Sequence, residues 1–189
     1  MTKYLLAHDI GTSGNKATLF STDGDMIASA THSYNTNYFN ESWAEQNPDD
    51  WWHAVCVTTN QLIEKIDPGD ILSISFSGQM MGCLCVDKHG VPLRNSIIYC
   101  DQRAIKQSEK LLEKLSFEEF YQICGHRISP VYAIEKLMWV KDMHPEIYNE
   151  TYKMLNAKDY IIFKLTGAFV TDYSDASGTN AFDIDKKEW

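Results

Sequence analysis

The sequence carries little positive charge. Its 189 residues include 17 Lys and Arg against 26 Asp and Glu, which gives a formal net charge of −9 at pH 7. A protein that grips phosphate backbones independently of base sequence needs the opposite sign, because Lys and Arg must displace the condensed counterions. The composition therefore argues against nucleic acid as a partner.

Long apolar runs are also missing. No stretch approaches the roughly 20 apolar residues of a membrane-spanning helix. The first residues lead into a strand-like segment instead of a basic and then apolar signal region. We therefore expect no membrane partner and a cytoplasmic location. The 44% hydrophobic and 12% aromatic content suffices for a substantial core, so we expect a globular domain.

The cysteines lack a metal-binding pattern. The five of them show no repeated zinc-type spacing, and no His pair in register accompanies them. Cys83 and Cys85 come closest to such a pattern, as a CxC pair. Because alternate residues of a strand share a face, we expect these two to be reduced thiols of the core and not a metal or redox site.

The periodicity and the turn signals predict an α/β domain. Strands are expected over residues 4–10, 16–21, 26–32, 71–77, 83–86 and 97–99. Helices are expected over residues 48 to about 66, 103–115, 133–142 and 158–165, from a capping box at Ser116 with Glu119, and briefly from Pro145. From residue 168 onward, alternating polar and apolar residues predict strands and turns. Three early strands joined by short turns predict an N-terminal antiparallel meander in a mixed sheet.

The sharpest local feature is Asp-Ile-Gly-Thr-Ser-Gly-Asn-Lys at residues 9–16. Such a loop between two strands can bring backbone N–H groups and two hydroxyls against phosphate oxygens, while Asp9 holds a magnesium ion or its waters and Lys16 adds a point charge. It is not a P-loop, since no helix and no Gly-Lys-Thr or Gly-Lys-Ser follows. An ordinary hairpin turn, in which Gly11 and Gly14 supply only positive φ, remains the alternative.

The same loop resembles the phosphate loop of the FGGY carbohydrate kinases. Six further segments agree with that family in order and spacing, closest to its xylulokinases: Trp-Ala-Glu-Gln-Asn-Pro-Asp-Asp-Trp-Trp at 43–52, Ser-Gly-Gln-Met-Met-Gly at 77–82, Asp-Gln-Arg at 101–103, Lys-Leu-Met-Trp-Val at 136–140, Lys-Asp-Tyr at 158–160 and Ser-Asp-Ala-Ser-Gly-Thr at 174–179. The resemblance covers essentially the whole chain.

This resemblance implies a two-domain kinase of the actin and hexokinase superfamily. Each domain is built on a ribonuclease-H-like sheet, and sugar, ATP and Mg²⁺ meet in the cleft between the domains. The residues expected to face the phosphate groups are Asp9, which also binds the metal, Gly11, Thr12, Ser13 and Lys16. The residues expected around the sugar are Gln79, Met80, Met81, Asp101 and Arg103.

Several of these residues have a plainer alternative. Arg103 could simply pair with Asp101 near a helix start. The tryptophans at 43, 51 and 52 are better explained as core packing than as a stacking platform for the sugar. Asp159 and Asp175 could be caps or turn residues.

Departures from the family pattern bear on the substrate. Met81 replaces the histidine that xylulokinases usually place beside the ketose, which removes a hydrogen-bond donor and leaves a flexible apolar surface. The resemblance therefore leaves D-xylulose in doubt as the substrate. His8 stands where relatives usually have an aliphatic residue, and Val131 and Ala133 also depart from the usual choices. These differences indicate a divergent subgroup.

The resemblance implies that the general-base Asp and the adenosine-binding segments of the family would lie beyond Trp189. Residues 1–189 are thus expected to form the N-terminal sugar-binding domain, incomplete at its C-terminal end and without the second, ATP-binding domain. No catalytic base can be assigned, and this fragment alone is expected to be inactive. Its expected partners are the sugar, ATP and the C-terminal domain of the same protein, and a homodimer is left open.

The expected reaction is ATP-dependent phosphorylation of a hydroxyl of a ketopentose such as xylulose, or of a related sugar or polyol. Two alternatives stay open. One is another FGGY kinase, acting on gluconate, a polyol or a different sugar. The other is a non-catalytic sugar-binding or regulatory relative, since fold does not fix function. A binding module has no need of a metal carboxylate, so Asp9 and the Gly-Thr-Ser loop argue against the second alternative.

Overall fold

The largest sheet lies at the N-terminal end of the chain. The computed structural model describes residues 2–64 and 66–189. Strands β1 (Tyr4–Ile10), β2 (Gly14–Ser21) and β3 (Met26–Ser33) form an antiparallel meander, and β6 (Ile71–Gly78) pairs with β1 in parallel. The order in the sheet is therefore β3-β2-β1-β6. The expected meander and the expected mixed sheet are both confirmed.

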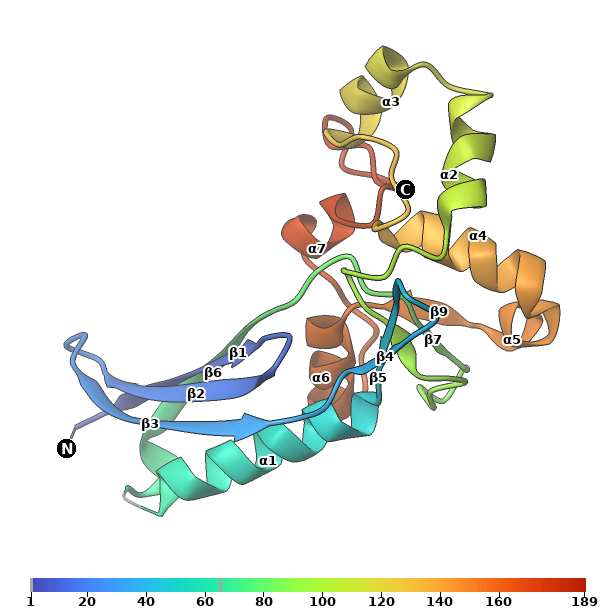
Figure 1. Ribbon diagram of the computed structural model, residues 1–189. Helices are drawn as coiled ribbons and strands as arrows, with labels where there is room; N and C mark the ends of the chain where they lie inside the picture. Colours follow the sequence, from blue (N-terminus) through green and yellow to red (C-terminus); the bar gives the residue numbers. More distant parts are fainter. Residues whose placement is uncertain (1, 65) are drawn as a thin grey trace.

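Helix α1 (Pro48–Ile63) covers one face of this sheet (Figure 1). The Asn47 side chain caps it by accepting a hydrogen bond from the N–H of Asp49, and proline occupies the first helical position, as the sequence predicts. The core between helix and sheet is formed by Leu6, Ala17, Leu19 and Leu62. The helix was expected to run to about residue 66, but it ends at Ile63; residue 65 lies outside the described residues.

Two small sheets connect the large sheet to the helical part of the molecule. One has the order β4-β5-β8, and the other pairs β7 with β9. Their bounds are Asn37–Phe39 for β4, Trp43–Gln46 for β5, Leu84–Val86 for β7, Ser96–Ile97 for β8 and Lys153–Leu155 for β9. Strands β4, β5 and β9 were not expected, because strands of three or four residues form through pairing with other segments and leave almost no periodicity. Strand β8 was expected over 97–99 but ends at Ile97. The chain turns directly after it, and the N–H of Asp101 donates to the carbonyl of Ile98.

Six further helices complete the described residues: α2 (Ile105–Leu112), α3 (Phe117–Cys124), α4 (Ala133–Met143), α5 (Pro145–Glu150), α6 (Ala157–Thr166) and α7 (Tyr173–Ser177). The capping box of Ser116 and Glu119 is present at the start of α3, as expected. Helix α7 corrects the expectation of only strands and turns after residue 168. Asp172 caps this helix by accepting hydrogen bonds from the N–H groups of Ser174 and Asp175.

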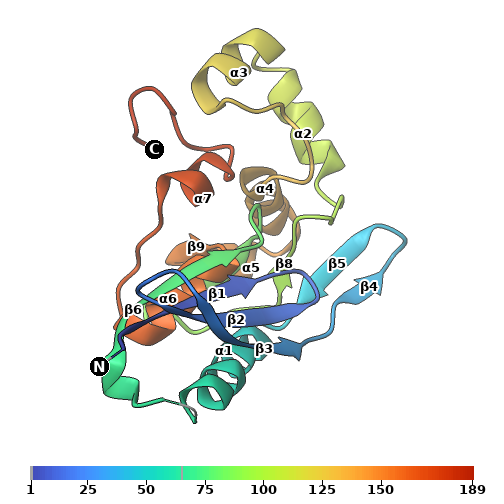
Figure 2. The same ribbon diagram turned by 90° about the vertical axis from the view of Figure 1, so that its left-hand side faces the viewer.

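A further core cluster lies in the helical part of the molecule, whose helices α2, α3 and α4 lie above the N-terminal sheet in Figure 2. Cys83 and Cys85 are both buried in it beside Trp139 and Val140. All five cysteines are free thiols, as expected for the CxC pair. Among the helices of residues 2–64 and 66–189, none is both long and apolar enough to cross a membrane.

Candidate functional site

The site lies where β1 and β6 end. These strands are parallel neighbours with Ile10 in register with Gly78, so the loops that follow them leave the same edge of the sheet. The N–H of Gln79 donates to the carbonyl of Ile10 at 2.8 Å, which joins the two loops at their first residues. The phosphate loop and the Gln-Met-Met segment are thus brought side by side from positions about 68 residues apart in sequence.

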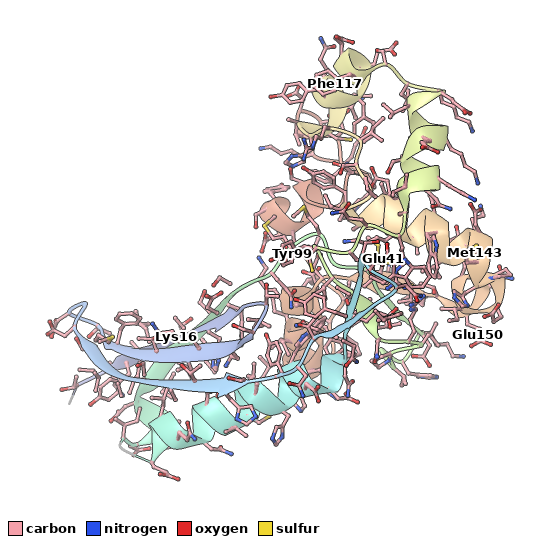
Figure 3. The ribbon with its side chains drawn as sticks, viewed as in Figure 1. Lys16, Glu41, Tyr99, Phe117, Met143 and Glu150 are labelled. Atoms are coloured by element: carbon pink, nitrogen blue, oxygen red, sulfur yellow. The ribbon has the colours of Figure 1, made fainter. Side chains whose placement is uncertain are left out.

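An open hollow of about 410 Å³ lies between the two loops. Its lining residues are Asp9, Gly11, Thr12, Gly78, Gln79, Met80, Met81 and Tyr99. Six of these belong to the expected sets, three to the phosphate-binding set and three to the sugar-binding set. Tyr99 also lines the hollow, although the sequence did not single it out. Its side chain is 38% exposed at the junction of the sheet and the helical part (Figure 3). An aromatic ring at this position offers an apolar wall for the C–H face of a bound ring or chain.

The backbone carbonyl groups of the phosphate loop accept hydrogen bonds from neighbouring segments. The hydroxyl of Tyr34 donates to the carbonyl of Gly11, the N–H of Tyr34 donates to that of Ser13, and the Gln46 side chain donates to that of Thr12 at 2.6 Å. A β-carbon on Gly14 would lie 2.6 Å from the carbonyl oxygen of His32, so only glycine fits there. The loop is therefore more constrained than an ordinary hairpin turn.

Asp9 and Lys16 face each other across β1 and β2. They are paired in the antiparallel register, so both side chains leave the same face of the sheet, and both are exposed. The hydroxyl of Ser77 donates to Oδ1 of Asp9 at 3.0 Å and orients the carboxylate. Lys16, labelled in Figure 3, does not line the hollow itself. The pair therefore places one negative and one positive charge beside the loop.

A magnesium ion fits this donor set only with help from a ligand. In the described part of the chain, no group of three or more His, Cys, Asp or Glu side chains is arranged to hold a metal. Mg²⁺ commonly keeps several waters and is bound through one or two carboxylates together with phosphate oxygens. A single exposed carboxylate at Asp9 suits that kind of binding and not an all-protein cage.

The loop after β6, expected to face the sugar, presents one amide and two methionines. Nε2 of Gln79 donates to Oε1 of Gln46 at 2.7 Å, while Oε1 of Gln79 has no hydrogen-bond partner among the described residues. That oxygen is buried, so the Gln79 amide has one unused acceptor directly behind the lining of the hollow. Met81 has φ of +61°, in the left-handed region. The methyl group of Met80 lies so close to Gly178 that a β-carbon there would be 3.1 Å from it.

Gln46 was missed as a site residue. It is fully buried, and its side chain contacts both loops and the start of α1. Nε2 donates to the carbonyl of Thr12 and to Oγ1 of Thr36, while Oε1 accepts from Gln79 and from Nε1 of Trp51. The sequence offered one signal, the polar Gln inside the Trp-x-Glu-Gln block, but its partners lie on other segments.

Asp101 and Arg103 are placed in the interior and do not line the hollow. Nε and Nη2 of Arg103 donate to Asp101 at 3.0 and 2.7 Å, and Nη1 donates to Glu45 at 2.7 Å. The guanidinium lies 4.1 Å from the centre of the Trp43 ring. This geometry favours the ion pair near a helix start. A direct contact of either side chain with a sugar stays a prediction.

His8 lies on the opposite side of β1 from Asp9, against α1. Nδ2 of Asn15 lies 3.0 Å from Nδ1 of His8 and 2.8 Å from Oγ1 of Thr58, and Oγ1 of Thr59 lies 3.3 Å from Nε2 of His8. Burial lowers the pKa of His8 to about 4, against which the hydrogen bond from Asn15 acts only partly. The imidazole is therefore neutral at pH 7 and belongs to a polar network beneath the phosphate loop.

Asp159 and Asp175 act within the framework of the fold. Asp159 closes a capping box at the start of α6 by accepting from the N–H of Asn156 at 3.1 Å. Burial, with a further contribution from the neighbouring Asp175, raises the pKa of Asp159 to about 6. Asp175 is buried beside the ammonium group of Lys158 at 3.3 Å. The geometry of Asp159 matches its interpretation as a cap residue. Asp175 is not a cap or turn residue, because it lies within α7, which Asp172 caps, and its side chain pairs with Lys158.

Comparisons with known proteins agree on one group. The model of the N-terminal domain of the FGGY family of carbohydrate kinases matches residues 4–189. The chain is 33% identical over 186 residues to the xylulose kinase of Staphylococcus xylosus, covering 98% of this chain and 38% of that protein. It is 33% identical over 189 residues to the gluconokinase of Bacillus subtilis (strain 168), covering 100% of this chain and 37% of that protein.

Solved structures agree as well. The gluconate kinase from Lactobacillus acidophilus superimposes with a TM-score of 0.94 at 31% identity, covering 100% of this chain and 38% of that one. The xylulose kinase from the same organism gives 0.93 at 31% identity, with 99% and 38% covered. The ribonuclease-H-like fold of the actin and hexokinase superfamily, implied by the sequence resemblance, is thereby confirmed. The chain spans well under half the length of these relatives.

Proposed function

This chain belongs to the FGGY family of carbohydrate kinases, and on that basis we propose that it supplies the sugar pocket and the phosphate loop of a kinase. The reaction transfers the terminal phosphoryl group of ATP to a hydroxyl of a small polyhydroxylated substrate, with xylulose and gluconate as the first candidates. The observation that carries this proposal is the single hollow lined by Asp9 and Thr12 on one side and by Gln79, Met81 and Tyr99 on the other.

On the phosphate side, positioning and charge neutralisation are the main tasks, because phosphoryl transfer needs little covalent chemistry from the protein. The hydroxyls of Thr12 and Ser13 and the N–H groups of their loop are suited to phosphate oxygens. Asp9 would hold Mg²⁺, which when bound neutralises charge on the phosphate groups. Ser77 keeps the Asp9 carboxylate oriented, and Lys16 adds a positive charge on the same face of the sheet.

On the sugar side, the hollow combines one polar group with apolar walls. Gln79, which lines the hollow, supplies the polar group that orients the substrate. The Tyr99 ring and the methionines at 80 and 81 provide apolar contacts for the carbon skeleton. Asp101 and Arg103 act from the interior, by fixing the segment that carries Tyr99.

The general base and the adenosine site are proposed to come from a C-terminal domain of the same polypeptide. Residues 1–189 alone are therefore proposed not to catalyse phosphoryl transfer from ATP. The relatives' extra length supports this division, since this chain covers 38% of the xylulose kinase of S. xylosus. We propose the cytoplasm as the location, because ATP is available there as the phosphoryl donor.

The test is sugar-dependent ADP release by the full-length polypeptide with Mg²⁺, across a panel of ketoses, polyols and aldonates. We expect turnover with at least one member of the panel and none without a sugar. A folded full-length protein that binds a panel member yet phosphorylates none would contradict the proposal and favour a binding or regulatory role.

A further inference from the structure

Lys136 places a charged group in the interior of the molecule. The residue is 0% exposed, and its ammonium nitrogen donates to three backbone carbonyls, those of Met81 at 2.8 Å, Ile98 at 2.8 Å and Val131 at 2.6 Å. Three acceptors match the three N–H bonds of an ammonium group. Burial lowers the pKa of Lys136 to about 8, so the fully protonated form that serves all three carbonyls still predominates at pH 7.

The first acceptor belongs to a wall of the hollow. Met81 lines it and has φ of +61°, a backbone conformation that residues with a β-carbon rarely adopt. The peptide group after Met81 is held at both ends, because Lys136 binds its carbonyl and Oδ1 of Asn156 accepts from the N–H of Gly82 at 3.0 Å. These two contacts stabilise a backbone conformation that local preference disfavours.

The second acceptor belongs to a second part of the lining, the one that carries Tyr99. Ile98 directly precedes Tyr99, and its carbonyl receives both the Lys136 ammonium and the N–H of Asp101. The third acceptor, Val131, lies just before α4, the helix that carries Lys136 itself. One buried cation therefore connects the Met81 wall and the Tyr99 wall to the start of α4.

We propose that Lys136 is a positioning residue that sets the distance and orientation of the Met81 and Tyr99 walls, and thereby the affinity for the sugar. This inference rests on the proposed function of the hollow as a sugar pocket. Lysine suits the role better than arginine, because a compact ammonium can point its donors at three carbonyls in different directions, whereas the planar guanidinium fork cannot.

The first experiment measures amide hydrogen exchange and does not depend on kinase activity. Lys136→Met keeps the length of the side chain and removes its donors, and Lys141→Met, exposed on the same helix, is the matched control. In the full-length polypeptide we expect amide hydrogen exchange at Gly82 and Asp101 to accelerate about tenfold or more in Lys136→Met, with little change in β1 and β2. Should this variant fail to fold, Lys136→Gln, which retains two N–H donors, takes its place.

The second experiment uses the full-length polypeptide. We expect Lys136→Met or Lys136→Gln to raise the KM for the sugar about tenfold while the KM for ATP stays within about twofold of wild type. Exchange that accelerates equally in β1 and β2, or not at all, would overturn the inference, as would equal increases in both KM values. If the wild-type protein phosphorylates no sugar, the proposed function fails, and the exchange experiment alone decides the role of Lys136.

Discussion

Gln46 and Gln79 are joined by a side-chain hydrogen bond in which Nε2 of Gln79 donates to Oε1 of Gln46 at 2.7 Å. The other end of the Gln46 amide donates to the carbonyl of Thr12. One buried side chain therefore connects the proposed sugar side of the hollow to its phosphate side. A shift of either loop would therefore displace the other through the hydrogen bonds of this amide.

Replacing Gln46 by Glu removes the donor to Thr12 and buries a carboxyl group there. Because a buried carbonyl then loses its partner, we expect kcat/KM of the full-length protein to fall about 10- to 100-fold for both sugar and ATP. Gln61→Glu, exposed on α1, is the control. Wild-type kinetics in a Gln46→Glu variant that is only destabilised would restrict Gln46 to a role in stability.

Asp9 is exposed, so its replacement should affect rate far more than stability. We expect Asp9→Asn to lower kcat of the full-length protein at least roughly a hundredfold, the scale of losing a key electrostatic group, with little change in Tm. Steady-state kinetics and thermal unfolding measure the two effects, with Asp23→Asn in the exposed β2–β3 turn as control. Near-normal activity in a destabilised Asp9→Asn protein would make Asp9 a turn residue.

Met81 lines the hollow with a thioether where a hydrogen-bond donor would favour a ketose. We expect Met81→His to raise kcat/KM for D-xylulose relative to the native substrate about tenfold to a hundredfold, since one hydrogen bond is worth on the order of 1 to 3 kcal/mol. Histidine also tolerates the left-handed backbone of this position better than most residues. The substrate panel, with exposed Met143→His as control, measures the ratio.

The prediction about Met81 has a clear counter-result. A wild-type protein that already prefers D-xylulose, with a ranking unchanged by Met81→His, would mean that Met81 does not contact the sugar. Gluconate as the native substrate would agree with the prediction.

His8 makes the stability of the chain sensitive to acid. Its pKa is about 4 in the folded state and 6.5 as the ordinary value. Between these values the unfolded chain binds a proton that the folded chain does not, so the free energy of unfolding falls as the pH is lowered from 6.5 toward 4. Above pH 6.5 the imidazole is neutral in both states and contributes no pH dependence.

The corresponding measurement is urea unfolding at pH 7 and pH 5. Linkage gives a loss of about 2 kcal/mol from His8 at pH 5. In His8→Leu, the decrease between the two pH values should be smaller than in wild type by about that amount. Equal decreases in both proteins would show that His8 is protonated in the folded state as readily as in the unfolded one.

Local signals in the sequence determined the first part of this structure. The β1–β3 meander, the Asn47 cap of α1 and the capping box before α3 all follow from neighbouring residues, since turns, caps and alternating apolar residues act over a few positions. The phosphate loop belongs to the same class. Its residues are contiguous, so their order alone indicates a loop with donors for phosphate oxygens.

Only the tertiary structure decided which polar side chains line the hollow and which serve the interior. Tyr99 lines the hollow, whereas Asp101 and Arg103, two and four positions later, are buried in an ion pair. Lys136 reaches the carbonyl of Met81 across 55 positions of sequence. Burying a charged or amide group is favourable only when distant partners satisfy its hydrogen bonds, and no local pattern of residues records where those partners will lie.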